Sequence, residues 1–252
     1  MYKQLICSVV LGMGFSLSAC NTNAENALPV IWTEAFTLPP MMEADVKVKT
    51  QADVSKLLSA KWYSAFEVKK PLSNNKDDIR SIGTCESYFS NPGMETVVSR
   101  DYGPYLGIGL MCKAAKIIAS AGVSSKSYLT NLKFDKELPV ILPKSFAMVV
   151  STSESKRIDE NKSLVTWGDV EKITKTEIKS TNATEYYVQG GQYTVELVAK
   201  GDFNNDKIED WLISSTYSVT GGTYVSFRMF AVTMTKANSG ITIIEEISDK
   251  TD

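Results

Sequence analysis

From about residue 172 onward, the hydrophobic pattern of the chain changes to a period of two. Between residues 193 and 200, apolar side chains alternate with more polar ones, as in a strand with one buried face. The predicted buried side carries Tyr193, Val195, Leu197 and Ala199. Three further segments are rich in β-branched and aromatic residues, namely 211–219, 223–235 and 241–247. Sequential strands with short connections predict an antiparallel β-meander.

Before about residue 172, the spacing of apolar residues is mostly that of helices. A helix is predicted from Pro104 to Ala121, because proline suits a first turn and Gly122 suits the position after the last one. Residues 53–64 also have nearly helical apolar spacing, whereas residues 151–170 are polar and predicted to form a loop. The predicted fold class is therefore α+β, with a mostly helical N-terminal part followed by a C-terminal antiparallel β-meander.

Composition restricts the possible functions. The chain has 252 residues, with 27 basic and 29 acidic side chains, so its near-neutral balance gives no reason to expect a nucleic-acid partner. It contains no histidine, which excludes Ser-His-Asp and Cys-His catalysis and imidazole as a metal ligand. We expect a protein that is not an enzyme.

The first twenty residues have the pattern of an export signal. Lys3 is followed by an apolar run from Leu5 to Leu17, which is too short to span a bilayer core of about 30 Å. The sequence then reads Leu-Ser-Ala-Cys, ending at Cys20, and this resembles the lipobox of bacterial lipoproteins. The resemblance implies cleavage before Cys20, fatty acylation of that cysteine with chains such as palmitate, and a membrane anchor. Asn21, where aspartate would indicate inner-membrane retention, favours the outer membrane.

These features predict four regions. Residues 1–19 form the signal peptide, and residues 20–50, rich in asparagine and proline, form a lipidated tether. Residues 51–170 form the helical, disulfide-containing part, and residues 171–252 form the antiparallel sheet. The predicted location is the cell envelope, on the outer membrane.

Two cysteines, Cys85 and Cys112, remain in the predicted mature domain. An even pair in an exported, oxidising compartment predicts a disulfide. A catalytic thiol and a metal site are alternatives, but both lack the histidine that would normally complete them.

One loop between predicted strands has the spacing D-x-N-x-D-x-x-x-D. Its candidate calcium ligands are Asp202, Asn204, Asp206 and Asp210, with the carbonyl of Ile208. The spacing resembles FG-GAP-type calcium loops and the first nine positions of an EF-hand. Lys207 replaces the usual glycine, and Ile213 replaces the EF-hand glutamate. The alternative is a metal-free loop whose side chains accept hydrogen bonds from backbone amides in Asx turns.

The segment from Val195 to Tyr224 also resembles a group of uncharacterised exported bacterial proteins, which implies a shared fold but no activity. The sequence therefore predicts a non-catalytic binding or interaction module, anchored to the membrane, with an unidentified protein or envelope-polymer partner. The alternative is a hydrolase of envelope polymers that uses a pair of carboxylates.

Overall fold

The computed structural model describes residues 27–73, 75–149, 151–237 and 239–248. The predicted signal peptide and the predicted lipidation site at Cys20 lie outside the described residues. No helix among the described residues is long and apolar enough to cross a membrane.

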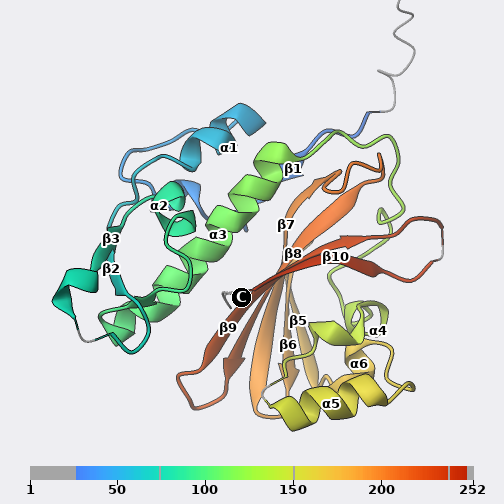
Figure 1. Ribbon diagram of the computed structural model, residues 1–252. Coiled ribbons are helices and arrows are strands. Elements are labelled where there is room, and N and C mark those ends of the chain that lie inside the picture. Colours follow the sequence, from blue (N-terminus) through green and yellow to red (C-terminus); the bar gives the residue numbers. More distant parts are fainter. Residues whose placement is uncertain (1–26, 74, 150, 238, 249–252) are drawn as a thin grey trace, which may run out of the picture.

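A seven-stranded antiparallel sheet dominates the C-terminal half (Figure 1). Six strands follow one another as a meander in the order β10-β9-β8-β7-β6-β5, and β1 pairs with the end of β7. The bounds are β1 Ile31–Trp32, β5 Lys175–Ser180, β6 Ala183–Val188, β7 Gly191–Gly201, β8 Asp210–Val219, β9 Val225–Thr233 and β10 Thr242–Ser248.

Both faces of this sheet are covered. One face carries Tyr193, Val195 and Leu197, which belong to a core that also includes Phe146 and Trp167 from the helical segments after residue 137. Three short helices lie on this side: α4 Leu138–Ile141, α5 Thr152–Glu160 and α6 Trp167–Val170.

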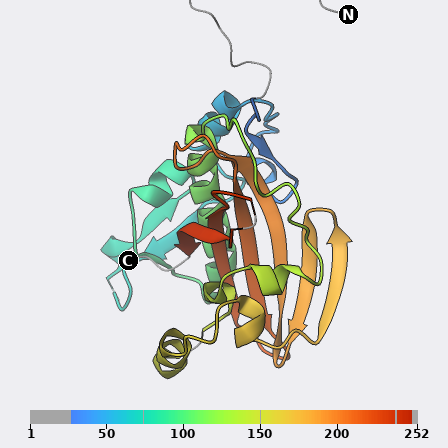
Figure 2. The ribbon, with the colours of Figure 1, turned by 90° about the vertical axis from the view of Figure 1, so that its right-hand side faces the viewer.

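The opposite face packs against α3 (Tyr102–Ser120), so that helix and sheet form two layers (Figures 1 and 2). Leu212 and Met229 belong to this second core, together with Leu110 and Ala114 of α3. A bulge between Leu197 and Ala199 interrupts the predicted alternation. As a result, Ala199 joins the core beside α3 instead of the core that contains Leu197.

The predicted fold class is wrong in its description of the N-terminal part, which is not mostly helical. This part contains a second antiparallel sheet of three strands in the order β3-β2-β4. Its strands are β2 Phe66–Lys69, β3 Arg80–Ile82 and β4 Glu95–Thr96. Helices α1 (Gln51–Leu57) and α2 (Cys85–Phe89) are short, and each begins with a capping box. The described residues also include four 3-10 helices: η1 Pro39–Met41, η2 Lys76–Asp78, η3 Ser99–Asp101 and η4 Lys144–Phe146.

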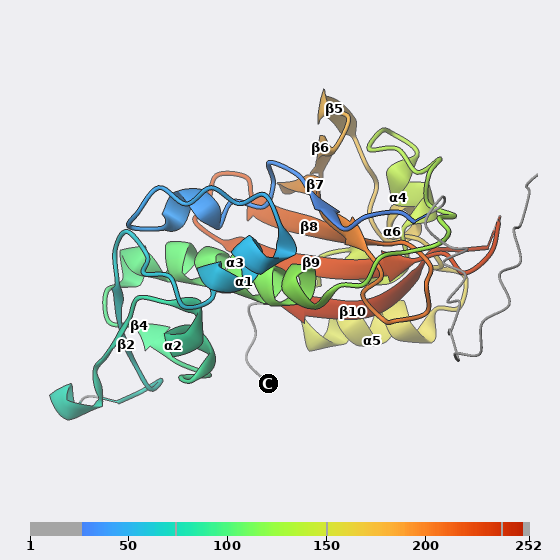
Figure 3. The same ribbon diagram turned by 90° about the horizontal axis from the view of Figure 1, so that it is seen from above.

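Cys85 and Cys112 form a disulfide that joins α2 to the middle of α3, with 5.4 Å between the two Cα atoms. Both residues are fully buried. The segment from Ile31 to Met42 also packs onto the domain, with Phe36 and Leu38 buried in the core beside α3 (Figure 3). This segment therefore contributes to the same layer as α3.

Candidate functional site

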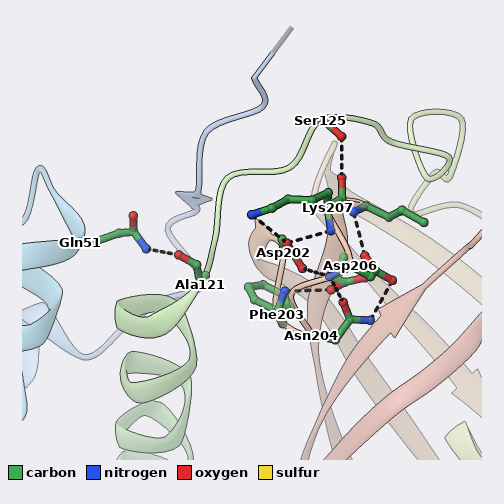
Figure 4. A network of polar contacts seen from close by, with 10 residues as sticks. Gln51, Ala121, Ser125, Asp202, Phe203, Asn204, Asp206 and Lys207 are labelled. Carbon is green, nitrogen blue, oxygen red and sulfur yellow. Dashed lines mark hydrogen bonds and ion pairs between the residues drawn. The ribbon is translucent and has the colours of Figure 1, made fainter. Parts of the chain in front are cut away.

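The acidic loop, residues 202–210, connects β7 to β8 and folds tightly around its own side chains (Figure 4). The carboxylate of Asp202 is buried and accepts hydrogen bonds from the backbone N–H groups of Asp206 (3.1 Å) and Lys207 (2.9 Å). Asn204 Oδ1 accepts from the N–H of Asp206 at 3.0 Å, and Asp206 Oδ1 accepts from the N–H of Ile208 at 2.8 Å. These are the contacts of Asx turns.

Two residues of this loop have the left-handed backbone conformation, Asn205 with φ of 66° and Lys207 with φ of 69°. Lys207 therefore adopts the conformation for which calcium loops of this spacing use glycine. A residue with a side chain in the left-handed conformation costs about 1 kcal/mol relative to glycine, and the hydrogen bonds of the loop must offset this cost.

The predicted calcium ligands Asp202, Asn204 and Asp206 lie together, but their oxygens already accept hydrogen bonds within the loop. Among the described residues, no group of three or more acidic or cysteine side chains is placed to hold a metal ion. Each of these oxygens has two lone pairs, so an amide hydrogen bond does not by itself prevent it from binding a cation.

Asp210 stands at the base of the acidic loop and is fully buried. Its Oδ2 accepts a hydrogen bond from the N–H of Phe203 at 2.9 Å, and the hydroxyl group of Thr233 also interacts with the carboxylate. Burial raises the pKa of Asp210 to about 6, and the negative charges of Asp206 and Asp202 act in the same direction.

The acidic loop also holds the chain where it leaves α3. Gly122 and Asp202 exchange two backbone hydrogen bonds, of 2.8 and 3.0 Å. Farther along, the N–H and the hydroxyl group of Ser125 donate to the carbonyl of Lys207 (Figure 4). The hydroxyl group of Ser127 donates to Glu209. The loop therefore fixes the segment that crosses from the α3 face of the sheet to the opposite face. This structural role was not predicted from the sequence.

A cleft of about 870 Å³ lies between the N-terminal half of α3 and the sheet, and we refer to it as the α3 cleft. The cleft lies on the same sheet face as the core beside α3, near the ends of β8 and β9. Helix α3 contributes Tyr102, Gly103, Pro104, Leu106, Gly107, Ile108, Leu110 and Met111; the sheet and its β8–β9 turn contribute Glu196, Ser214, Thr216, Thr223, Val225 and Phe227; and the segments before α3 contribute Ala35, Thr37, Met41, Ser99 and Arg100.

The walls of the α3 cleft are chemically different. The helix wall is apolar, and two glycines on it leave space, because a Cβ atom added to Gly103 or Gly107 would meet nothing within 4 Å. The sheet wall carries the hydroxyl groups of Ser214 and Thr216 and the carboxylate of Glu196. Large apolar side chains are exposed where the cleft opens, including Met41 (46%) and Tyr102 (47%). An exposed apolar rim of this kind is typical of a binding site.

Glu196 is half-buried on β7, on the face that α3 covers. Burial raises the pKa of its carboxyl group, and the negative charge of Glu34 raises it further. In the part of the chain that the structure describes, no hydrogen bond or ion pair reaches this carboxylate. The basic side chain that lines the cleft, Arg100, is largely exposed and lies 3.6 Å from its neighbour Asp101.

No protein-family model matches the chain, and no curated protein or solved structure matches it significantly. The α3 cleft and the acidic loop are therefore the features from which a function can be inferred.

Proposed function

We propose that this protein is a membrane-anchored envelope lipoprotein that acts as a non-catalytic binding module, with the α3 cleft as its ligand site. The observation that carries this proposal is a cleft of about 870 Å³ with an apolar helix wall and a few polar groups opposite it. Sites for small molecules usually have volumes of roughly 300–1,000 Å³ and this mixture of apolar lining and sparse polar groups.

The lining of the cleft favours binding over hydrolysis. A glycoside hydrolase needs two carboxyl groups about 5–10 Å apart on either side of the bond that is cleaved. Among the described residues that line the α3 cleft, one is acidic, namely Glu196. The proposed role is therefore to hold a ligand, without a chemical step.

The proposed membrane anchor depends on the lipobox that ends at Cys20. Mass spectrometry of the protein purified from membranes tests it directly. We expect a mature chain that begins at Cys20 and carries acyl chains. A chain that retains Met1, or an unmodified cysteine in the aqueous phase after detergent partitioning, would disprove the anchor.

Binding in the cleft can be tested with N-phenyl-1-naphthylamine, a neutral dye that becomes fluorescent in apolar sites. The protein would be the full mature chain with Cys20→Ser, so that no lipid of its own competes for the dye. We expect fluorescence enhancement with the parent chain and its loss in Gly107→Phe, because the new ring occupies the open space on the helix wall.

Gly240→Phe provides the matched control, since Gly240 is exposed in a loop outside the cleft and also has open space around its Cβ position. It should bind the dye like the parent chain. Equal fluorescence in the parent chain and Gly107→Phe would disprove ligand binding in the α3 cleft.

A structural calcium site in the acidic loop is a second proposal, supported by the spacing of Asp202, Asn204 and Asp206 and by the buried carboxylate of Asp210 at the base of the loop. Bound calcium would stabilise the folded protein by an amount that rises with the logarithm of the calcium concentration once that concentration exceeds the dissociation constant. We expect millimolar calcium to raise the melting temperature relative to excess chelator, and Asp206→Asn to reduce this increase. An unchanged melting temperature in the parent protein would disprove the site.

A further inference from the structure

The α3 cleft contains a carboxylate without a counter-charge. Glu196 projects from β7 into a space bounded by the apolar side of α3, and in the described chain no donor or basic group contacts it. Unpaired carboxylates at partly buried positions are unfavourable, because desolvation is not compensated by a hydrogen bond or an opposite charge. A ligand that brings a positive charge would supply that compensation.

The charges around the cleft also favour a ligand with a positive charge. Glu34 is close enough to Glu196 to influence it electrostatically, so the region near the sheet wall is negative. The side chain of Arg100 is 86% exposed and lies beside Asp101, in the 3-10 helix before α3. An anionic headgroup would therefore meet repulsion near the sheet, whereas a cation would be attracted.

The remainder of the cleft favours an apolar body on the same ligand. Leu106 and Leu110 line the helix side, Phe227 lines the sheet side, and Gly107 leaves room between them. Apolar surface transferred from water into such a space contributes about 25 cal/mol per Å². A ligand with an apolar body and one charged end would use both walls.

We propose that the α3 cleft binds an amphipathic cation, an amine with an apolar body, whose ammonium group pairs with Glu196 while its apolar part lies along α3. This inference depends on the proposed binding function of the cleft and specifies the ligand class. The hydroxyl groups of Ser214 and Thr216 lie on the same wall as Glu196 and offer further acceptors to the ammonium protons.

Three probes with the same alkyl chain separate charge from apolar contact: decylammonium, decanol and decanoate. Isothermal titration calorimetry with the full mature chain carrying Cys20→Ser, below the micelle-forming concentration of each probe, measures their affinities. We expect decylammonium to bind at least tenfold more tightly than decanol, and decanoate to bind most weakly.

Glu196→Gln keeps the shape of the side chain and removes its charge. This variant should bind decylammonium and decanol with similar affinity, while its decanol affinity remains that of the parent chain. Glu34→Gln should also reduce the preference for decylammonium over decanol, but by a smaller factor than Glu196→Gln does. Glu160→Gln, exposed on α5 across the sheet, should leave all three affinities unchanged and is the matched control.

The outcomes distinguish the ligand class from the binding function. If Glu196→Gln and Glu34→Gln retain the full preference for decylammonium, the amphipathic-cation inference is wrong. If decanol still binds the parent chain and Gly107→Phe abolishes this binding, the proposed function stands without that inference. If none of the three probes binds the folded parent chain, both are wrong. A melting curve for each variant confirms that it is folded.

Discussion

Gly107 and Gly109 lie on the same helix, α3, and have opposite surroundings. A Cβ atom added to Gly109 would lie 2.5 Å from Cζ of Tyr88, whereas a Cβ atom added to Gly107 would meet nothing within 4 Å. Gly109 thus allows α2 and α3 to approach closely beside the disulfide, and Gly107 opens the α3 cleft. Both glycines lack a positive φ, so the helix does not need glycine for its backbone conformation at either position.

Alanine substitutions at these two positions should therefore have opposite effects. Gly107→Ala should increase the free energy of unfolding by about 0.5–1 kcal/mol, since alanine is favoured over glycine within a helix. Gly109→Ala should decrease it by roughly 1–3 kcal/mol, because Tyr88 must move. Urea denaturation of the two variants measures both values, and effects of the same sign would contradict this account of the helix.

Removing the disulfide should destabilise the protein substantially. Cys85→Ala combined with Cys112→Ala opens a covalent loop with a sequence separation of 27 residues. The expected loss in the free energy of unfolding is roughly 3–4 kcal/mol, because the unfolded chain gains conformational freedom. Urea denaturation of the oxidised protein and the double variant tests this. An unchanged midpoint would show that the crosslink does not contribute to stability.

Glu171 should stabilise the core on the other face of the sheet. Its carboxylate accepts hydrogen bonds from the phenol of Tyr193 and from Nε1 of Trp167, the latter at 2.8 Å. Glu171→Ala would leave both buried donors without their acceptor, and we expect a loss of about 1–3 kcal/mol per unsatisfied group. Glu171→Gln retains an acceptor and should lose much less. Thermal melts compare the two variants, and equal losses would contradict the role of these hydrogen bonds.

Glu196 should make stability depend on pH. Because burial and the charge of Glu34 raise its pKa, the folded protein holds this proton more tightly than the unfolded chain does. The corresponding stability is present below the ordinary glutamate pKa and is lost as the pH rises through the raised value. Glu196→Gln should therefore increase the melting temperature more near neutral pH than at acidic pH.

Melting curves of the parent protein and Glu196→Gln, recorded over the same pH series, measure that difference. Subtracting one profile from the other removes the contributions of acidic groups that do not interact with Glu196. Parallel profiles would show that Glu196 has the same proton affinity in the folded and unfolded states.

Periodicity in the sequence located the long elements. The helix predicted from Pro104 to Ala121 corresponds to α3, which has proline in its first turn and buried residues on several sides. The three strands of the small N-terminal sheet were missed, since they have two to four residues and include charged side chains such as Glu67. Strands this short carry too few alternations to distinguish them from loops.

Helix α5 was predicted as loop because its sequence is polar on nearly every side, with Ile158 as its buried residue. A local pattern could have indicated it. Ser151 accepts a hydrogen bond from the N–H of Glu154, and serine followed three residues later by glutamate is typical of a helix start.

The acidic loop could be located from the spacing of its side chains, but its partners could not. Its contacts with Gly122 and Ser125 join segments about 80 residues apart, and no local pattern reports such contacts. The α3 cleft was missed for a similar reason, as its lining comes from several separate segments. Glu196 falls on the more polar face of the strand predicted over residues 193–200, whereas α3 covers that face in the structure.

The seven-stranded sheet provides one wall for each of the two hydrophobic cores. Adjacent residues of β8, such as Trp211 and Leu212, belong to different cores, so neither core can be exposed without loss of the strands that support the other. The two cores should therefore unfold in a single cooperative transition rather than one after the other.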